Sequence, residues 1–85
     1  MTQHVFCAIY DKAVQAYMRP FQAPTVGSAM RSFKDDVRNQ ESPANLHPED
    51  YALFQIATFD DQTGLMQPME PICLRRAHEI NQEIN

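Results

Sequence analysis

Basic and aromatic side chains in the first half of the chain are the groups whose types and spacing best suggest a chemistry. Residues 1–40 hold five Lys and Arg against three acids, a balance of +2, whereas residues 41–85 hold two Arg against eight acids, a balance of −6. Cations follow the phosphates of single-stranded nucleic acid, and aromatic rings stack on its bases. The candidate nucleic-acid contacts are Lys12, Tyr17, Arg19, Phe21, Arg31, Lys34 and Arg38.

The three basic residues of the predicted helix also have a simpler interpretation. Arg31, Lys34 and Arg38 follow i, i+3, i+7 spacing and form one stripe. Such a stripe is typical of a solvated helix face, where Asp35 can pair with Arg31 at i+4 spacing. The net charge of −4 also argues against a generic polyanion binder. The nucleic-acid hypothesis therefore depends on the uneven distribution of the charges.

The histidines and cysteines carry weaker chemical signals. His4, His47 and His78 are 43 and 31 residues apart, so no metal-binding pair lies on one helix. A zinc site built from His4, Cys7, Cys73 and His78 would need the two ends of the chain to meet. A nucleophilic pair of Cys7 and His78 lacks a third orienting group and an oxyanion-hole motif.

The carboxylates and glycines offer no catalytic pattern either. Adjacent acids at positions 35–36, 49–50 and 60–61 point in different directions on a helix or strand, so they suit capping and turns better than a shared-proton pair. Gly27 and Gly64 are the only glycines, which excludes a glycine-rich phosphate loop. We expect no catalytic residue, no metal and no cofactor.

The elements that would position the basic and aromatic residues begin with two strands and a helix. Residues 5–10 are β-branched and aromatic, which predicts a buried central strand. Residues 16–21 predict an edge strand or a strand end, because Pro20 cannot donate to a ladder. A helix is predicted over residues 25–38, with Thr25 as N-cap and Asn39 in a left-handed C-terminal position. Its apolar face would consist of Val26, Ala29, Met30, Phe33 and Val37.

The second half predicts a hairpin and a second helix. A polar loop over residues 40–50 contains one tight helical turn at 48–50 and leads into a strand over 51–59. Residues 60–64 close a hairpin in which Gly64 supplies a positive φ. The partner strand over 65–69 is an exposed edge, because Pro68 and Pro71 interrupt its donors. A short C-terminal helix is predicted from Cys73, Ala77, Ile80 and Ile84.

These elements predict an α+β protein with the order β-β-α-β-β-α. We expect a single domain over residues 1–85: a small antiparallel or mixed four-stranded sheet with one main helix and a short C-terminal helix. Because 85 residues make only a thin core, we also expect a homodimer. Two distant cysteines favour a reducing compartment, and the apolar run at 5–10 is too short for a membrane span, so we expect a cytosolic protein.

Several segments together resemble a phage protein family. The chain contains V-F-C-A-I-Y-D-K-A, Y-M-R-P-F-Q-A-P, A-M-R-S-F-K-D and H-P-E-D-Y-A-L-F-Q-I-A-T-F-D-D-Q-T-G-L-M-Q-P. Over residues 5–77 it resembles the small nonstructural protein of gokushoviruses, the single-stranded DNA phages of the Microviridae. The resemblance implies a protein of the host bacterial cytoplasm that acts in single-stranded DNA binding, synthesis or packaging. It supplies no catalytic motif.

Two functions of different classes follow from the residues and the resemblance. In the first, a homodimeric module binds single-stranded DNA through the seven candidate residues and has no enzymatic activity. In the second, the protein is an adaptor that contacts the phage replication or capsid proteins through its acidic second half and exposed strands.

Overall fold

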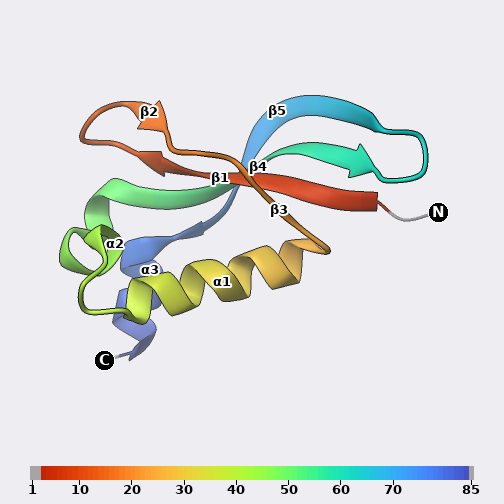
Figure 1. Ribbon diagram of the computed structural model, residues 1–85. Coiled ribbons are helices and arrows are strands. Elements are labelled where there is room, and N and C mark those ends of the chain that lie inside the picture. Colours follow the sequence, from red (N-terminus) through yellow and green to blue (C-terminus); the bar gives the residue numbers. More distant parts are fainter. Residues whose placement is uncertain (1–2, 85) are drawn as a thin grey trace.

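A curled antiparallel sheet forms one layer of the molecule and the helices form the other (Figure 1). The computed structural model describes residues 3–84, with side chains described as far as Gln82. The elements are β1 (Gln3–Asp11), β2 (Ala16–Tyr17), β3 (Phe21–Ala23), α1 (Val26–Arg38), α2 (Pro43–Leu46), the 3-10 turn η1 (Pro48–Asp50), β4 (Tyr51–Asp60), β5 (Leu65–Arg76) and α3 (Ala77–Ile84). The predicted α+β class, with one main helix and a short C-terminal helix, is confirmed. None of the described helices is long and apolar enough to cross a membrane.

The sheet has the strand order β2-β1-β4-β5, and β3 also pairs with β1. Because β4 occupies one edge of β1, β2 and β3 share its other edge. The prediction of one strand over residues 16–21 was wrong in one respect, because this segment is divided between two short strands, β2 and β3. Pro20 lies in the division, where a residue without a backbone N–H cannot continue the ladder.

The predicted hairpin is confirmed and its second strand is longer than expected. Gly64 has φ 75°, and its N–H donates to the Asp60 carbonyl at 2.8 Å. Strand β5 runs on to Arg76, so the prediction of helical structure from Cys73 was wrong: Cys73 pairs with Phe54, and α3 begins at Ala77. Register shifts in the β4–β5 ladder accommodate this long, proline-containing edge strand. The side chain of Ile84, part of the predicted helical face, lies outside those described.

Helix α1 begins and ends where the sequence predicts, with a different C-terminal geometry. The Thr25 hydroxyl accepts a hydrogen bond from the Ser28 N–H at 3.0 Å, as expected of an N-cap. Asn39 was expected in a left-handed conformation and is extended, with φ −75° and ψ 114°. Its side-chain oxygen accepts from the Glu41 N–H at 3.0 Å, so an Asx-type turn ends the helix in place of a glycine-like cap.

The loop after α1 contains the predicted turn at Pro48–Asp50 and an additional helical turn, α2, that was not predicted. The Ser42 hydroxyl caps α2 by accepting from the Ala44 N–H at 3.1 Å. The Asn45 amide donates to the Val37 carbonyl at 2.8 Å, which attaches α2 to the end of α1. Serine followed by proline is the sequence signal for such a start.

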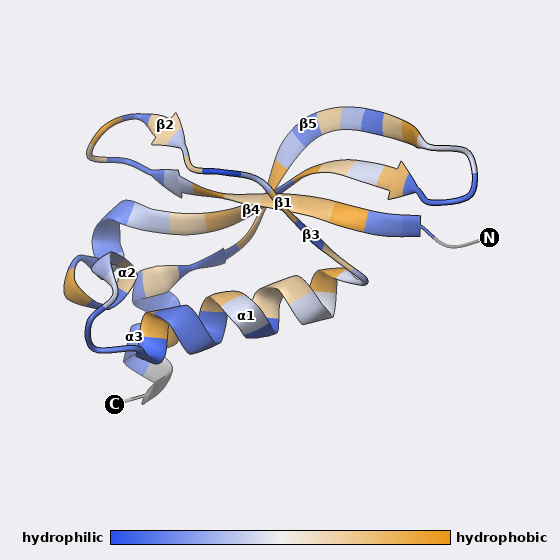
Figure 2. Cartoon of the chain, in the orientation of Figure 1, coloured by the Kyte–Doolittle hydropathy of each residue, from blue (hydrophilic) through white to orange (hydrophobic). Residues whose placement is uncertain are grey.

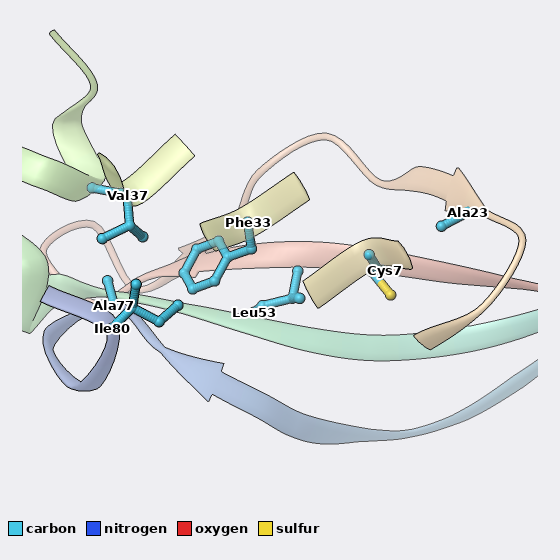
Figure 3. Close-up of a cluster of buried hydrophobic side chains, with 9 residues drawn as sticks. Cys7, Ala23, Phe33, Val37, Leu53, Ala77 and Ile80 are labelled. Atoms are coloured by element: carbon cyan, nitrogen blue, oxygen red, sulfur yellow. The ribbon is translucent and has the colours of Figure 1, made fainter. Parts of the chain in front are cut away.

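The hydrophobic core lies between the sheet and the helices (Figure 3). Helix α1 contributes Ala29, Phe33 and Val37, which confirms the predicted apolar face. They meet Cys7 of β1 and Leu53 of β4, both fully buried. The shortest dimension of the molecule is 19 Å, enough for the sheet and one helix layer about 10 Å thick. The core therefore occupies only one side of the sheet.

Candidate nucleic-acid interface

Alternation along β1 divides its side chains between two faces of the sheet. Val5, Cys7 and Ile9 belong to the core beneath the helices. Successive strand residues point to opposite sides, so Phe6, Ala8 and Tyr10 point away from the helices. All described helices lie on the same side of the sheet (Figure 1). We call the other side the open face.

Three aromatic rings from three strands meet on the open face. The ring centroids of Tyr10 and Tyr17 are 4.9 Å apart, those of Tyr17 and Phe54 are 5.5 Å apart, and those of Tyr10 and Phe54 are 6.1 Å apart. All three contacts are edge-to-face, a favoured aromatic geometry. Tyr17 remains 44% exposed. Phe6 and Phe59 form a further edge-to-face pair at 6.1 Å toward the other end of the sheet.

The pairing of β2 with β1 and the turn between them place Tyr17 in this cluster. Strand β2 pairs with β1 so that Tyr17 lies opposite Tyr10. The connecting turn is held by the Asp11 carboxylate, which accepts from the Ala13 N–H at 2.9 Å, and Gln15 adopts a positive φ of 56°. A ring on a two-residue strand is thereby fixed against the central strands.

A groove of about 550 Å³ opens beside the cluster at the end of β4. Tyr10 and Phe54 provide its aromatic walls, and Ala52 lines it as well. Tyr51 borders the groove at the start of β4 while its side chain packs against the core on the helix side. The pKa of the Tyr51 phenol is raised by burial and, to a lesser degree, by the neighbouring Asp11 carboxylate, which accepts a hydrogen bond from it. The phenol therefore stays neutral at physiological pH. A space of this size and shape suits a small, flat ligand.

Charged side chains of both signs line the same groove. Lys12, Arg76 and His78 contribute basic groups, and Glu49 and Asp50 contribute carboxylates. The Lys12 backbone N–H donates to the Asp50 carbonyl at 2.7 Å, so the two loops that carry these charges are joined by backbone. Among the side chains that the structure describes, no ion pair links these basic groups to the two carboxylates. The groove therefore presents donors and carboxylates that are not paired with one another.

Comparison with known proteins identifies the family. Residues 4–80 match the sequence model of the Phage ORF5 protein family. The chain belongs to this family. Neither a curated protein nor a solved structure matches it. Membership in this family makes the chain a phage protein.

Two of the seven predicted contact residues of this phage protein lie at the open face or its groove, namely Tyr17 and Lys12. Arg19 lies exposed in the link between β2 and β3. Phe21 is half-buried against the core on the opposite face, where it pairs with Cys7, so it does not form a stacking surface together with Tyr17.

The three helical candidates also lie on the other side of the phage protein. Arg31 and Arg38 are exposed and Lys34 is half-buried on α1. The helix directs Ala29, Phe33 and Val37 into the core, so the basic stripe lies away from the sheet. The predicted set is therefore divided between two sides of the molecule.

Sequence reasoning missed three residues of the open face: Tyr10, Phe54 and Arg76. The sequence could have indicated Tyr10, because side chains alternate along a strand and Tyr10 therefore points to the side opposite Val5 and Cys7. Arg76 lies opposite Ala52 in the β4–β5 ladder, which the unexpected length of β5 makes possible. Phe54 follows the buried Leu53 in β4, so alternation places it on the open face as well, but its meeting with Tyr10 and Tyr17 depends on strand pairing.

The histidines and cysteines are dispersed in the phage protein. The His4 imidazole contacts the Asp61 carboxylate at 2.9 Å. Cys7 is buried in the core, whereas Cys73 lies opposite Phe54 in β5. Within residues 3–84, no group of three metal-ligating side chains gathers. The alternative zinc site at His4, Cys7, Cys73 and His78 thus finds no support in the geometry.

Proposed function

We propose that this phage protein binds single-stranded DNA, without catalysis, during synthesis or packaging of a gokushovirus genome in the host cytoplasm. The observation that carries the proposal is the aromatic cluster on the open face, where Tyr17 presents an exposed ring edged by Tyr10 and Phe54. Stacking of one base on an aromatic side chain stabilises a complex by about 1–3 kcal/mol. Rings supported by neighbouring rings are already ordered before a base arrives.

The basic groups around the cluster support a phosphate path. Lys12 and Arg76 line the adjoining groove, and Arg19 lies exposed in the link that follows β2. Double-stranded DNA hides the faces of its bases, so a stacking surface favours unpaired strands. Arg31, Lys34 and Arg38 lie on the helix side, away from the aromatic cluster. They would contact phosphates if the DNA wrapped around the molecule, or if DNA bound to the second copy of the proposed homodimer reached them.

Fluorescence anisotropy with a labelled single-stranded oligonucleotide tests the proposal. We expect binding at low salt that weakens as salt is raised. Replacing Tyr17 by Ala should weaken affinity about tenfold, whereas Tyr17→Phe, which keeps the ring, should bind like the unaltered protein. Absence of binding at low salt, or equal affinity for Y17A, would contradict the proposal.

Strand β5 favours a second candidate, an adaptor for the phage replication or capsid proteins. Leu65 and Ile72 of this edge strand are 63% and 51% exposed, and an edge strand offers unpaired backbone groups to a partner. Pull-down with the purified phage proteins tests it, with Ile72→Ser expected to reduce capture and Val14→Ser, a substitution in the β1–β2 turn, as the control. If no partner is retained, the adaptor function is wrong.

A further inference from the structure

The groove at the end of β4 combines three chemical features that one nucleotide would use. Aromatic walls come from Tyr10 and Phe54, and the volume is about 550 Å³. Small-ligand pockets occupy roughly 300–1,000 Å³. A flat base with its sugar and phosphate matches both the size of the groove and its aromatic walls.

The charges in the groove complement the two ends of a nucleotide. Lys12, Arg76 and His78 can donate to a phosphate, whereas Glu49 and Asp50 can only accept hydrogen bonds when ionised. No ion pair among the described side chains joins the two sets. Glu49 and Asp50 belong to the first turn of η1, and this position also brings them to the wall of the groove. A base that enters the groove therefore meets acceptors as well as phosphate donors.

We infer that the groove is a subsite for one unpaired nucleotide whose base carries an exocyclic amino group. A carboxylate of Glu49 or Asp50 accepts a hydrogen bond from that amino group, and the basic residues hold the phosphate. Cytosine and uracil differ at this position, since cytosine presents an amino donor and uracil a carbonyl acceptor. A carboxylate accepts from the first and repels the second. This inference rests on the proposed function, because it assigns base selection to the same DNA-binding face.

The first experiment compares short oligonucleotides of deoxycytidine and of deoxyuridine by fluorescence anisotropy. We expect the deoxycytidine strand to bind about tenfold more tightly, the discrimination that one well-placed polar contact provides. Replacing both Glu49 and Asp50 by Ala should bring the ratio close to one. The ratio is the readout because removal of acids strengthens binding of every DNA strand through charge alone.

Two controls separate base selection from other effects. Glu41→Ala removes an acid that is exposed in the loop before α2 and does not line the groove, so the ratio should persist. Glu49 is exposed, so Glu49→Ala alone leaves the fold intact and should lower the ratio even where the double variant fails to fold.

The second experiment titrates the isotope-labelled full chain with deoxycytidine monophosphate, followed by NMR, with inorganic phosphate as the comparison. We expect shifts at the amides of Tyr51 and Ala52 with the nucleotide and not with phosphate alone. Equal affinity for the two oligonucleotides, with no such shifts, would overturn the subsite and leave DNA binding standing. Shifts without oligonucleotide binding would support the pocket and overturn the proposed function. Neither signal would overturn both.

Discussion

The two faces of the sheet use the same strands for different purposes. The covered face packs the fully buried Cys7 and Leu53 against the helices, with partly buried residues such as Val5 and Ile9 around them. The open face carries large aromatic side chains and none of the described helices, and the rings of Tyr10, Tyr17 and Phe54 contact one another there. Helix α1, which covers the first face, has both hydrophobic and hydrophilic residues along its length (Figure 2). Its hydrophobic residues Ala29, Phe33 and Val37 are the ones that are buried.

The two faces differ because the apolar residues of this small protein do not all belong to its core. A chain of this length has one thin core, and the covered face supplies it. Aromatic rings on the open face remain partly exposed, with Tyr17 44% exposed. Contiguous exposed apolar patches mark interaction sites, whereas scattered surface apolar residues are ordinary. The predictions below test whether stability and binding separate between the two faces.

The largest expected effect is on the covered face. Phe33→Ala should lower the free energy of unfolding by about 3–5 kcal/mol, because a fully buried ring is removed and a cavity remains. Tyr17→Ala on the open face should cost about 1 kcal/mol, the value of its edge-to-face contacts. Urea denaturation of both variants measures the difference. Equal losses of stability would show that the open face is part of the folding core.

The helix that covers the sheet should depend on its N-cap. Thr25→Ala removes the hydroxyl that accepts from the Ser28 N–H and should lower the free energy of unfolding by about 1 kcal/mol. Thr25→Ser keeps the acceptor and is the matched control. Thermal unfolding followed by circular dichroism measures both. A Thr25→Ser variant as unstable as Thr25→Ala would contradict a capping role.

The basic residues on the two sides should differ in their effect on DNA binding. Lys12→Gln in the groove should reduce the slope of log affinity against log salt by about 0.7, the value for one phosphate contact on a single strand. Lys34→Gln on α1 should leave the slope unchanged. Anisotropy titrations at several salt concentrations measure both. The opposite result would move the DNA path to the helical side.

The smallest expected effect is a loss of stability at alkaline pH that originates in the core. Burial raises the pKa of the Cys7 thiol above its ordinary value. The unfolded state then releases its proton first, so this contribution to stability is complete below the unfolded pKa and declines as pH rises toward the folded one. Urea denaturation from neutral to alkaline pH should show a steeper decline than for Cys7→Ala. Parallel curves would exclude the thiol as the cause.

Sequence patterns predicted the elements that depend on local chemistry. The apolar face of α1, the Thr25 cap and the Gly64 hairpin all follow from side chains within one or two turns of the chain. The limits of β5 did not follow, because Pro68 and Pro71 are tolerated only at an edge with register shifts, and pairing with β4 decides that. The extended Asn39 similarly reflects the hydrogen bonds of the following turn.

The candidate site was predicted in part, and Tyr17 and Phe21 show why. In one continuous strand these residues, four apart, would share a face, and Phe21 would lie opposite Phe6. It lies opposite Cys7, one residue along β1, because the link at Pro20 shifts the register of β3 relative to β2. A shift of one residue moves every side chain to the other face. Tyr17 therefore joins the open face and Phe21 joins the core.

Local periodicity and capping were enough to predict the central strand, the main helix with its apolar face and the Gly64 hairpin from the sequence. They were not enough to predict α2, the division between β2 and β3 or the length of β5. The sequence also showed that the basic residues are concentrated in the first half. Only the tertiary structure decided which aromatic and charged side chains meet. Tyr10, Tyr17 and Phe54 come together from three strands, and Lys12 and Arg76 reach one groove from distant segments. Their proximity depends on strand pairing and register, which side chains far apart in the chain establish together.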